Sequence, residues 1–407
     1  MNVASQLDRG RPPGTAPQVF AAFLQLGVTS FGGPIAHIGF FHEAFVIRRK
    51  WLTERAYTDV VALSQFLPGP ASSQVGMAIG LQRAGFAGMI AAWLAFTLPS
   101  AVLLVVFALA ITSVSGLTDG GWVQGLKAAA VAVVAQAVLS MARTLASDAR
   151  RATIAGAGAI AALLIPNSAL QVAVIVAAGL AGSLWLREAP VPAADDQEPA
   201  FEVRVPRAVA VACLTAWVVL LIGLPILARA VSGGALELFG IFFRAGALVI
   251  GGGHVVLPLL ESQTVPTGLV GHDAFLAGYG AAQAVPGPLF TFAAFLGAVN
   301  TGSPSGVAGA AIALIGIFLP GALLLVGALP FWLSIRTAPI ARRAVAGIGA
   351  GVVGILAAAL YDPVFTEGVT SPLSLAIAIA AVVALTKWRT PAWAVVIVAG
   401  ILGQLLL

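Results

Sequence analysis

The chain has 407 residues, of which 59% are hydrophobic and 9% are charged, and its mean hydropathy is +1.00. This composition excludes an ordinary soluble domain and predicts a polytopic membrane protein. The net charge of +5 does not indicate a nucleic-acid partner, because the basic residues lie in short segments between apolar ones, where they set membrane orientation. The single cysteine, Cys213, excludes a disulfide framework and a thiolate metal site, and no metal or organic cofactor is expected.

In chain order, the sequence begins with a polar segment. Residues 1–17 contain three prolines and no apolar core, which predicts a disordered tail and not a signal peptide. Residues 18–187 are predicted to form the first of two repeats, and residues 188–206 a polar, proline-rich cytoplasmic linker. Residues 207–231 predict a connecting transmembrane helix, and residues 232–407 form the second repeat.

Two breaks interrupt the apolar segments of each repeat. Gly32-Gly33-Pro34 and Pro68-Gly69-Pro70 recur about 218 residues later as Gly251-Gly252-Gly253 and Pro286-Gly287-Pro288. In lipid, a broken helix leaves backbone N–H and C=O groups that only protein, water or a ligand can satisfy. The sequence therefore predicts an all-α polytopic membrane protein of two repeats, with broken or re-entrant helix hairpins and a binding site at the breaks.

The charges beside the breaks predict that the two repeats are inverted. Four basic residues between positions 48 and 55 follow the first break of the first repeat, whereas residues 261–275 of the second repeat contain no Lys or Arg. By the positive-inside rule, the first segment is cytoplasmic and the second is not. Residues 207–231 supply the additional crossing that inversion requires.

Helices that restart inside a membrane favour an anion, because their first turns present unpaired N–H groups and the positive end of the helix dipole. Pro70 and Pro288 are expected in the first helical turn, where proline is tolerated best. The predicted substrate is an oxyanion held by backbone donors, hydroxyls and amides. The expected substrate-binding residues are Ser30, Gly32, Gly33, Pro34, Gln65, Gly69, Pro70, Ser72, Ser73, Lys127, Arg244, Gly251, Gly252, Gln283, Gly287, Pro288 and Thr291.

Two basic residues lie within apolar segments, where ionisable groups mark function. Arg244 is the better candidate for pairing with a doubly negative tetrahedral oxyanion, since its guanidinium suits paired oxygens. The alternative for Arg244 is neutralisation by Glu237 or Glu261. Lys127 is explained equally well as an interfacial anchor.

Four residues near the breaks are candidates for proton coupling: His37, Glu43, His254 and Glu261. A histidine beside a break can carry a proton in a coupled cycle, but a lone histidine more often serves packing. Glu43 and Glu261 lie at nearly matched positions near the mouths of the first hairpins, where carboxylates either gate protons or are solvated. Solvation is the favoured interpretation of both carboxylates.

The residues at the breaks resemble those of the chromate ion transporter family in its long, two-domain bacterial form. The resemblance covers residues 18–386 and rests on Phe31-Gly32-Gly33-Pro34, Arg49-Lys50-Trp51-Leu52, Gln65-Phe66-Leu67-Pro68-Gly69-Pro70, Leu98-Pro99 and their second-repeat counterparts. It implies secondary active export of chromate across the bacterial inner membrane, an antiport driven by the proton gradient that gives chromate resistance. The implied partners are chromate or sulfate, protons and the lipid bilayer, and a homodimer is left open.

Other functions fit the sequence less well. An enzyme is not expected, because His42-Glu43 has no second histidine one turn later for zinc, and no glycine-rich ATP-binding loop is present. A channel needs a continuous polar pathway, which 9% charged residues do not favour. A transporter of sulfate or another tetrahedral oxyanion is the harder alternative, because donors that bind one tetrahedral dianion bind another.

Overall fold

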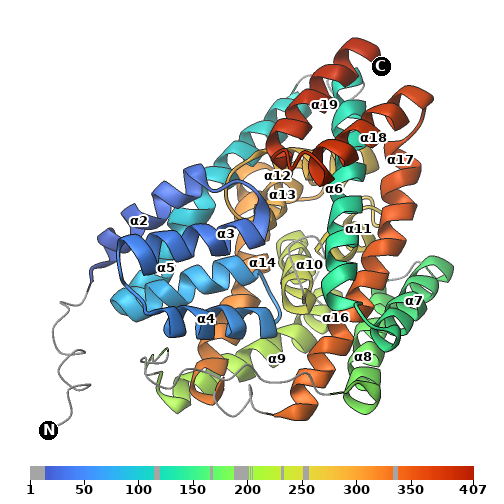
Figure 1. Ribbon diagram of the computed structural model, residues 1–407. Helices are drawn as coiled ribbons and strands as arrows, with labels where there is room; N and C mark the ends of the chain where they lie inside the picture. Colours follow the sequence, from blue (N-terminus) through green and yellow to red (C-terminus); the bar gives the residue numbers. More distant parts are fainter. Residues whose placement is uncertain are drawn as a thin grey trace, which may run out of the picture.

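The computed structural model describes residues 14–113, 120–165, 168–187, 201, 203, 205–230, 233–250, 256–332 and 338–407. This part of the chain contains helices and no strand (Figure 1), as the composition predicts. Five of its helices are long and apolar enough to cross a membrane. They are α5 (Ala71–Ser113), α6 (Gly121–Leu145), α9 (Arg207–Ala230), α14 (Gly306–Ala328) and α16 (Pro339–Ala359), the last two with the short turns that continue them.

The other helices of the first repeat are shorter than these five. They are α2 (Ala16–Thr29), α3 (Gly33–His42), the π-helical turn η1 (Glu43–Arg48), α4 (Glu54–Phe66), α7 (Ala149–Leu164) and α8 (Ser168–Trp185). α2 begins inside the segment expected to be a tail. It does so because Thr15 and Gln18 form a reciprocal capping box and Pro17 stands in the first turn.

The second repeat follows the same helix order. Its remaining elements are α10 (Gly234–Leu248), α11 (Val256–Thr264), α12 (His272–Ala284), η4 (Leu289–Thr291), α13 (Phe292–Val299), η5 (Leu329–Phe331), η6 (Leu360–Phe365), α17 (Thr366–Gly368), α18 (Pro372–Thr386) and α19 (Ala392–Leu406). α19 was not predicted from the sequence. α19 is the counterpart of α8 in the first repeat.

The structure confirms the broken helices wherever the breaks are described. α2 and α3 are separated at Gly32-Gly33-Pro34, α4 and α5 at Pro68-Gly69-Pro70, and α12 and η4 at Pro286-Gly287-Pro288. Gly69 and Gly287 have φ angles of 122° and 94°, a region that glycine enters without steric cost. The break at 251–253 lies outside the described residues.

Pro70 and Pro288 do not stand where the sequence placed them. Each precedes its helix: Pro70 accepts the N–H of Gln74 at 2.9 Å, and Pro288 is the N-cap residue of η4 with an extended backbone (φ −71°, ψ 132°). The prediction of a first-turn position was therefore wrong by one residue. The left-handed glycine before each proline turns the chain so sharply that the helix starts only after the proline.

α5 is itself interrupted, in addition to the break that precedes it. Its backbone leaves the helical region at Ala84 and Gly85, where Gly85 has φ 63° and ψ −157°. The corresponding glycine of the second repeat, Gly306, also has a positive φ of 60° and starts α14 after a short connection from α13. The first arm of α5 thus corresponds to α13, and the second arm to α14.

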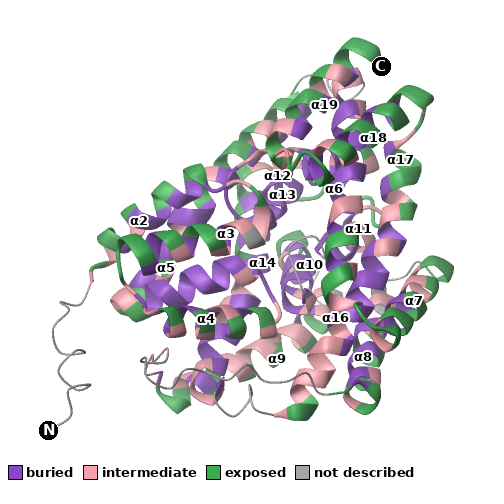
Figure 2. Ribbon diagram, in the orientation of Figure 1, coloured by how far each residue is buried: buried purple, intermediate pink, exposed green. Residues whose placement is uncertain are grey.

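The two repeats exchange helices. α6 packs against α18 and α19, and α16 packs against α7 and α8, so each long helix is covered by the last helices of the other repeat (Figure 1). Glycines allow the close approach, because a Cβ atom on Gly125 would lie 2.0 Å from the carbonyl oxygen of Ala399, and one on Gly347 would lie 2.2 Å from that of Ala178. Buried residues follow these contacts through the middle of the molecule, and exposed ones cover the outer helices (Figure 2).

Candidate functional site

The breaks of the two repeats are joined by a reciprocal pair of backbone hydrogen bonds. The N–H of Gly69 donates to the carbonyl of Val249 at 2.7 Å, and the N–H of Gly287 donates to the carbonyl of Ser30 at 2.9 Å. Ser30 and Val249 occupy equivalent positions before the glycine breaks, as Gly69 and Gly287 do in the proline turns. The proline turn of each repeat therefore donates a hydrogen bond to a backbone carbonyl at the end of the broken helix in the other repeat.

The proline turns also press against the long helices beside them. A Cβ atom on Gly69 would lie 3.0 Å from Cα of Gly321 in α14, and one on Gly287 would lie 2.8 Å from Oγ of Ser100 in α5. Ser100 and Gly321 directly follow Pro99 and Pro320, the prolines within those helices. These contacts repeat the pseudo-twofold relation of the hydrogen bonds and leave no room for a side chain at either turn glycine.

His37 connects both breaks of the first repeat. Its buried ring lies 3.2 Å through Nε2 from the carbonyl oxygen of Ser30, and 3.3 Å through Nδ1 from Oγ of Ser72. A carbonyl only accepts, so the contact with Ser30 assigns the proton to Nε2, and Nδ1 of a neutral ring then accepts from the Ser72 hydroxyl. The ring also meets Phe96 edge-on, at a centroid distance of 5.1 Å.

Buried hydroxyl groups lie on the helices that flank these breaks. Ser30, Ser64, Ser73 and Thr97 are buried, and within the described part of the chain their hydroxyl oxygens have no hydrogen-bond partner. A buried hydroxyl without a partner costs free energy, so each of them indicates water or a ligand that accepts hydrogen bonds. Ser72 is buried beside them in the chain and contacts His37.

Gln74 holds the first proline turn to the second repeat. Its Nε2 donates to the carbonyl of Pro68 at 3.0 Å and to the carbonyl of Gly321 at 3.1 Å. Gln74 is fully buried in the first turn of α5, next to Ser72 and Ser73. Both donors of the amide are thus used to position the turn.

Three other predicted site residues lie on α4, α6 and α10. Gln65 is exposed on the last turn of α4. Lys127 is buried on α6, where its Nζ pairs with the carboxylate of Asp273 at the start of α12, so its charge is neutralised by the second repeat. Arg244 is half-buried on α10, ahead of the second repeat's glycine break.

The carboxylates also have local surroundings of their own. Glu43 is exposed and accepts from Nε of Arg48 at 2.8 Å, as expected for a solvated group. Glu261 lies on α11 near Asp362, and the next residue, Ser262, donates to Oε1 of Gln171 on α8 at 3.2 Å.

Three predicted residues cannot be placed, because Gly251, Gly252 and His254 lie outside the described residues. In the rest of the second repeat, the hydroxyl of Thr291 donates to the carbonyl of Pro288 at 2.7 Å, and Gln283 is hydrogen-bonded to Tyr279.

Sequence reasoning did not select Ser64, Gln74, Thr97 and Ser100 for the site. Two of them had a signal in the sequence: Thr97 and Ser100 flank the Leu98-Pro99 pair, and a proline inside a membrane helix frees a carbonyl that neighbouring hydroxyls often serve. Gln74 stands in the first turn of a restarting helix, but its contact with Gly321 joins segments far apart in the sequence, and no local pattern predicts that contact.

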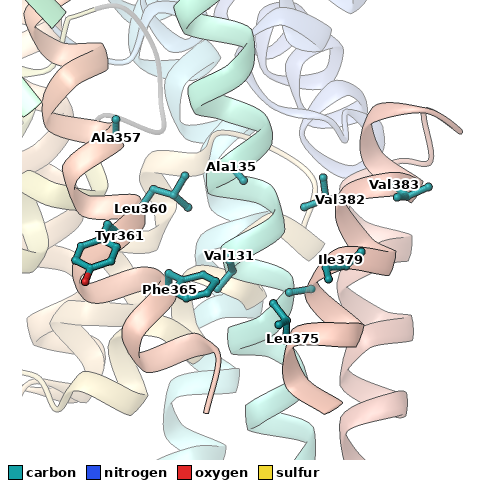
Figure 3. Close-up of a pocket in the computed structure, with 11 residues that line it drawn as sticks. Val131, Ala135, Ala357, Leu360, Tyr361, Phe365, Leu375, Ile379, Val382 and Val383 are labelled. Atoms are coloured by element: carbon teal, nitrogen blue, oxygen red, sulfur yellow. The ribbon is translucent and has the colours of Figure 1, made fainter. Parts of the chain in front are cut away.

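The apolar cavities of the molecule are unsuited to an oxyanion. One of about 510 Å³ lies between α6, η6 and α18 and is lined by side chains such as Val131, Leu360, Phe365 and Ile379 (Figure 3). Among the described residues that line it, Tyr361 is the one with a side-chain hydroxyl, so a dianion finds too few donors to replace its hydration there. Within the described ranges, no three His, Cys, Asp or Glu side chains gather in a way that would hold a metal ion.

Comparison with known proteins agrees with this architecture. The family model described as "Chromate transporter" matches residues 17–183 and again residues 236–404. The "Chromate transport protein" of Pseudomonas aeruginosa is 28% identical over 97% of this chain and 93% of its own length. The "Probable chromate transport protein" of Synechococcus elongatus is 29% identical over 86% of this chain and 84% of its own.

A third relative, the "Chromate transport protein" of Cupriavidus metallidurans, is 27% identical over 93% of this chain and 90% of its own length. No solved structure is significantly similar to the chain. The family model covers both repeats and leaves out α9 between them. The chain, an all-helical membrane protein of two repeats, belongs to the chromate transporter family.

Proposed function

We propose that this protein transports chromate across the membrane, with the oxyanion bound at the breaks of the first repeat. The observation that carries the site is the set of buried hydroxyls of Ser30, Ser64, Ser73 and Thr97, which have no hydrogen-bond partner among the described residues. These hydroxyls and the first turns of α3 and α5 are donors for oxyanion oxygens. The family membership and the printed functions of the three relatives support chromate as the substrate.

The direction and the energy source of transport are part of this proposal. Export across the inner membrane of a bacterium, coupled to the proton gradient, follows from the resemblance at the breaks. His37 is the best-placed group for coupling, because it touches both breaks and its Nδ1 contact with Ser72 changes from accepting to donating when the ring is protonated.

Alternating access has a structural basis in the reciprocal contacts. The hydroxyls of Ser30, Ser64, Ser73 and Thr97 are buried, so solvent does not reach them in this conformation. The bonds from Gly69 to Val249 and from Gly287 to Ser30 hold the two repeats together at that point. We infer that the repeats are inverted in the membrane and that one of these two bonds opens in each access state, as in other transporters with broken helices.

Sulfate is the second candidate substrate. The donors at the first breaks are neutral hydroxyls and backbone N–H groups, and such donors match any tetrahedral dianion of similar size. Selectivity between chromate and sulfate then depends on the dimensions of the open site.

The test is flux into proteoliposomes. Chromate and sulfate uptake would be measured with and without a pH gradient, for the parent, for Ser30→Ala combined with Ser72→Ala, and for Ser140→Ala, which changes an exposed serine on α6. We expect gradient-dependent chromate flux that the double variant loses and Ser140→Ala keeps. Full flux in the double variant would refute the proposed site, and absence of oxyanion flux in the parent would refute the proposed function.

A further inference from the structure

We propose that the protein has one oxyanion site, in the first repeat, and that the corresponding position in the second repeat is a hydrophobic support without a substrate. This inference rests on the proposed function. It asks whether the breaks of the second repeat bind substrate as those of the first repeat do. The repeated sequence and the reciprocal hydrogen bonds show that the two sets of breaks occupy equivalent positions.

The reciprocal hydrogen bonds and the shared prolines define which residues of the two repeats correspond. Ser30 and Val249 accept the same hydrogen bond from the turn glycine of the other repeat, which fixes the register at the first breaks. Gly69 and Gly287 fix it at the proline turns. Pro99 and Pro320 fix it on the long helices.

In this register the polar residues of the first site have hydrophobic counterparts. The pairs are Ser30 with Val249, His37 with Val256, Ser72 with Phe290, Gln74 with Phe292, and Thr97 with Phe318. All ten residues are buried, with exposed fractions of at most 3%. The difference therefore lies in the chemistry of these five pairs of described residues, in which only the first-repeat member carries a polar side chain.

Aromatic rings pack together where the second repeat would need a binding site. Phe292 meets Phe275 edge-on at a centroid distance of 5.2 Å, and Phe290 lies 6.1 Å from Phe318. Phe318 in turn meets Trp93 of the first repeat at 5.9 Å. A dianion placed among these rings would lose its hydration and face the negative ring surfaces.

Of the polar side chains that remain in the second repeat, the hydroxyl of Thr291 is engaged locally, whereas Nε2 of Gln283 is buried without a partner among the described residues. Ser73 corresponds to Thr291, but the hydroxyl of Thr291 donates to Pro288, whereas that of Ser73 has no partner among the described residues. Gln283 is bonded to Tyr279. The second repeat contributes to the site through the backbone of Gly287, which holds Ser30 in place.

The experiment measures binding stoichiometry and exchanges one matched pair of residues. Purified full-length protein in detergent would be equilibrated with radiolabelled sulfate and, separately, with chromate, and the bound oxyanion per chain would be counted. The variants are Ser30→Val, which introduces the residue of the second repeat, and Val249→Ser, which makes the reverse change. Thr97→Val, nearly equal in volume to the parent residue, removes a hydroxyl with little steric disturbance.

We expect one oxyanion bound per chain, an affinity at least tenfold lower in Ser30→Val and in Thr97→Val, and unchanged affinity in Val249→Ser. Two oxyanions bound per chain would overturn the single site while leaving the proposed function intact. One oxyanion bound with normal affinity in both Ser30→Val and Thr97→Val would also overturn it. No binding of either oxyanion by the parent would instead refute the proposed function. Size-exclusion chromatography of each variant separates loss of binding from loss of folding.

Discussion

At the scale of single residues, His37 is the side chain on which the candidate site depends most. Its ring contacts both Ser30, at the first break, and Ser72, in the first turn after the second break. An imidazole suits this position because it donates from one ring nitrogen while it accepts at the other. The sequence made His37 a candidate proton carrier but favoured a packing role, and the buried ring contacts Ser30, Ser72 and Phe96.

Substitutions at His37 separate hydrogen bonding from packing. Glutamine can donate to the carbonyl of Ser30, whereas phenylalanine fills the space without a polar atom. We expect His37→Phe to reduce chromate flux about tenfold or more, since an unsatisfied buried polar group costs about 1–3 kcal/mol. His37→Gln should retain measurable flux and lose its dependence on the pH gradient. Proteoliposome assays at matched protein content check both, and equal flux in the two variants would contradict the role.

Gln74 supports a prediction about stability. Gln74→Leu removes both bonds from Nε2 and leaves the carbonyls of Pro68 and Gly321 short of a donor. We expect a loss of about 1–3 kcal/mol in the free energy of unfolding. The control is Gln82→Leu, which changes an exposed glutamine on the same helix. Thermal unfolding in detergent measures the melting temperature of each variant. Equal melting temperatures for Gln74→Leu and Gln82→Leu would contradict the stabilising role of Gln74.

At the scale of helices, the ion pair between Lys127 and Asp273 joins α6 of the first repeat to α12 of the second. Its two partners are unequally exposed: 4% of the Lys127 side chain is accessible, against 59% of that of Asp273. Removing the lysine leaves a carboxylate that solvent already reaches. Removing the carboxylate leaves a buried ammonium group without its partner, which is the more expensive change.

Two variants test this asymmetry. Asp273→Asn should cost about 3–5 kcal/mol of stability, as for a buried pair that has lost one partner. Lys127→Met should cost about 0–1 kcal/mol, because the carboxylate that remains is largely solvated. Unfolding midpoints of the two variants and of the parent decide the matter. Equal destabilisation would show that Lys127 is not held in place by Asp273.

The helices also show how far local sequence patterns reach. The breaks were predictable, because glycine and proline act on their own segment of chain. The exchange of α18 and α19 onto α6 was not, since the glycines that permit it, such as Gly125 and Gly347, are equally common in ordinary membrane helices. The sequence predicted that Lys127 binds substrate or anchors the helix. It did not predict the ion pair with Asp273, because Asp273 lies in the other repeat.

The candidate site could be predicted in part for the same reason. Ser30, Ser72 and Ser73 stand directly beside the breaks, so their place in the site followed from the motifs. Gln65 has the same proximity in sequence but projects from an exposed face of α4, and only the packing of α4 shows which of its faces is buried.

At the scale of the whole molecule, the reciprocal contacts relate the two repeats by a pseudo-twofold axis. α9 has no counterpart in the family's two matched regions and connects the end of one repeat to the start of the next. A single additional crossing reverses the orientation of everything that follows it. The basic residues between positions 48 and 55 and the absence of Lys and Arg from 261–275 support the same inversion through the positive-inside rule.

Cysteine labelling tests the inversion directly. Cys213 would first be replaced by alanine, and single cysteines would then be placed at Thr53, the N-cap of α4, and at Thr267, an exposed residue after α11. In intact cells we expect a membrane-impermeant maleimide to label Thr267→Cys and to label Thr53→Cys only after the membrane is permeabilised. Each variant must retain chromate flux, so that the labelled population is the folded transporter. Labelling of both positions from the same side would make the repeats parallel, and the proposed alternation of the two reciprocal hydrogen bonds would then have no basis, because both breaks would open toward one face of the membrane.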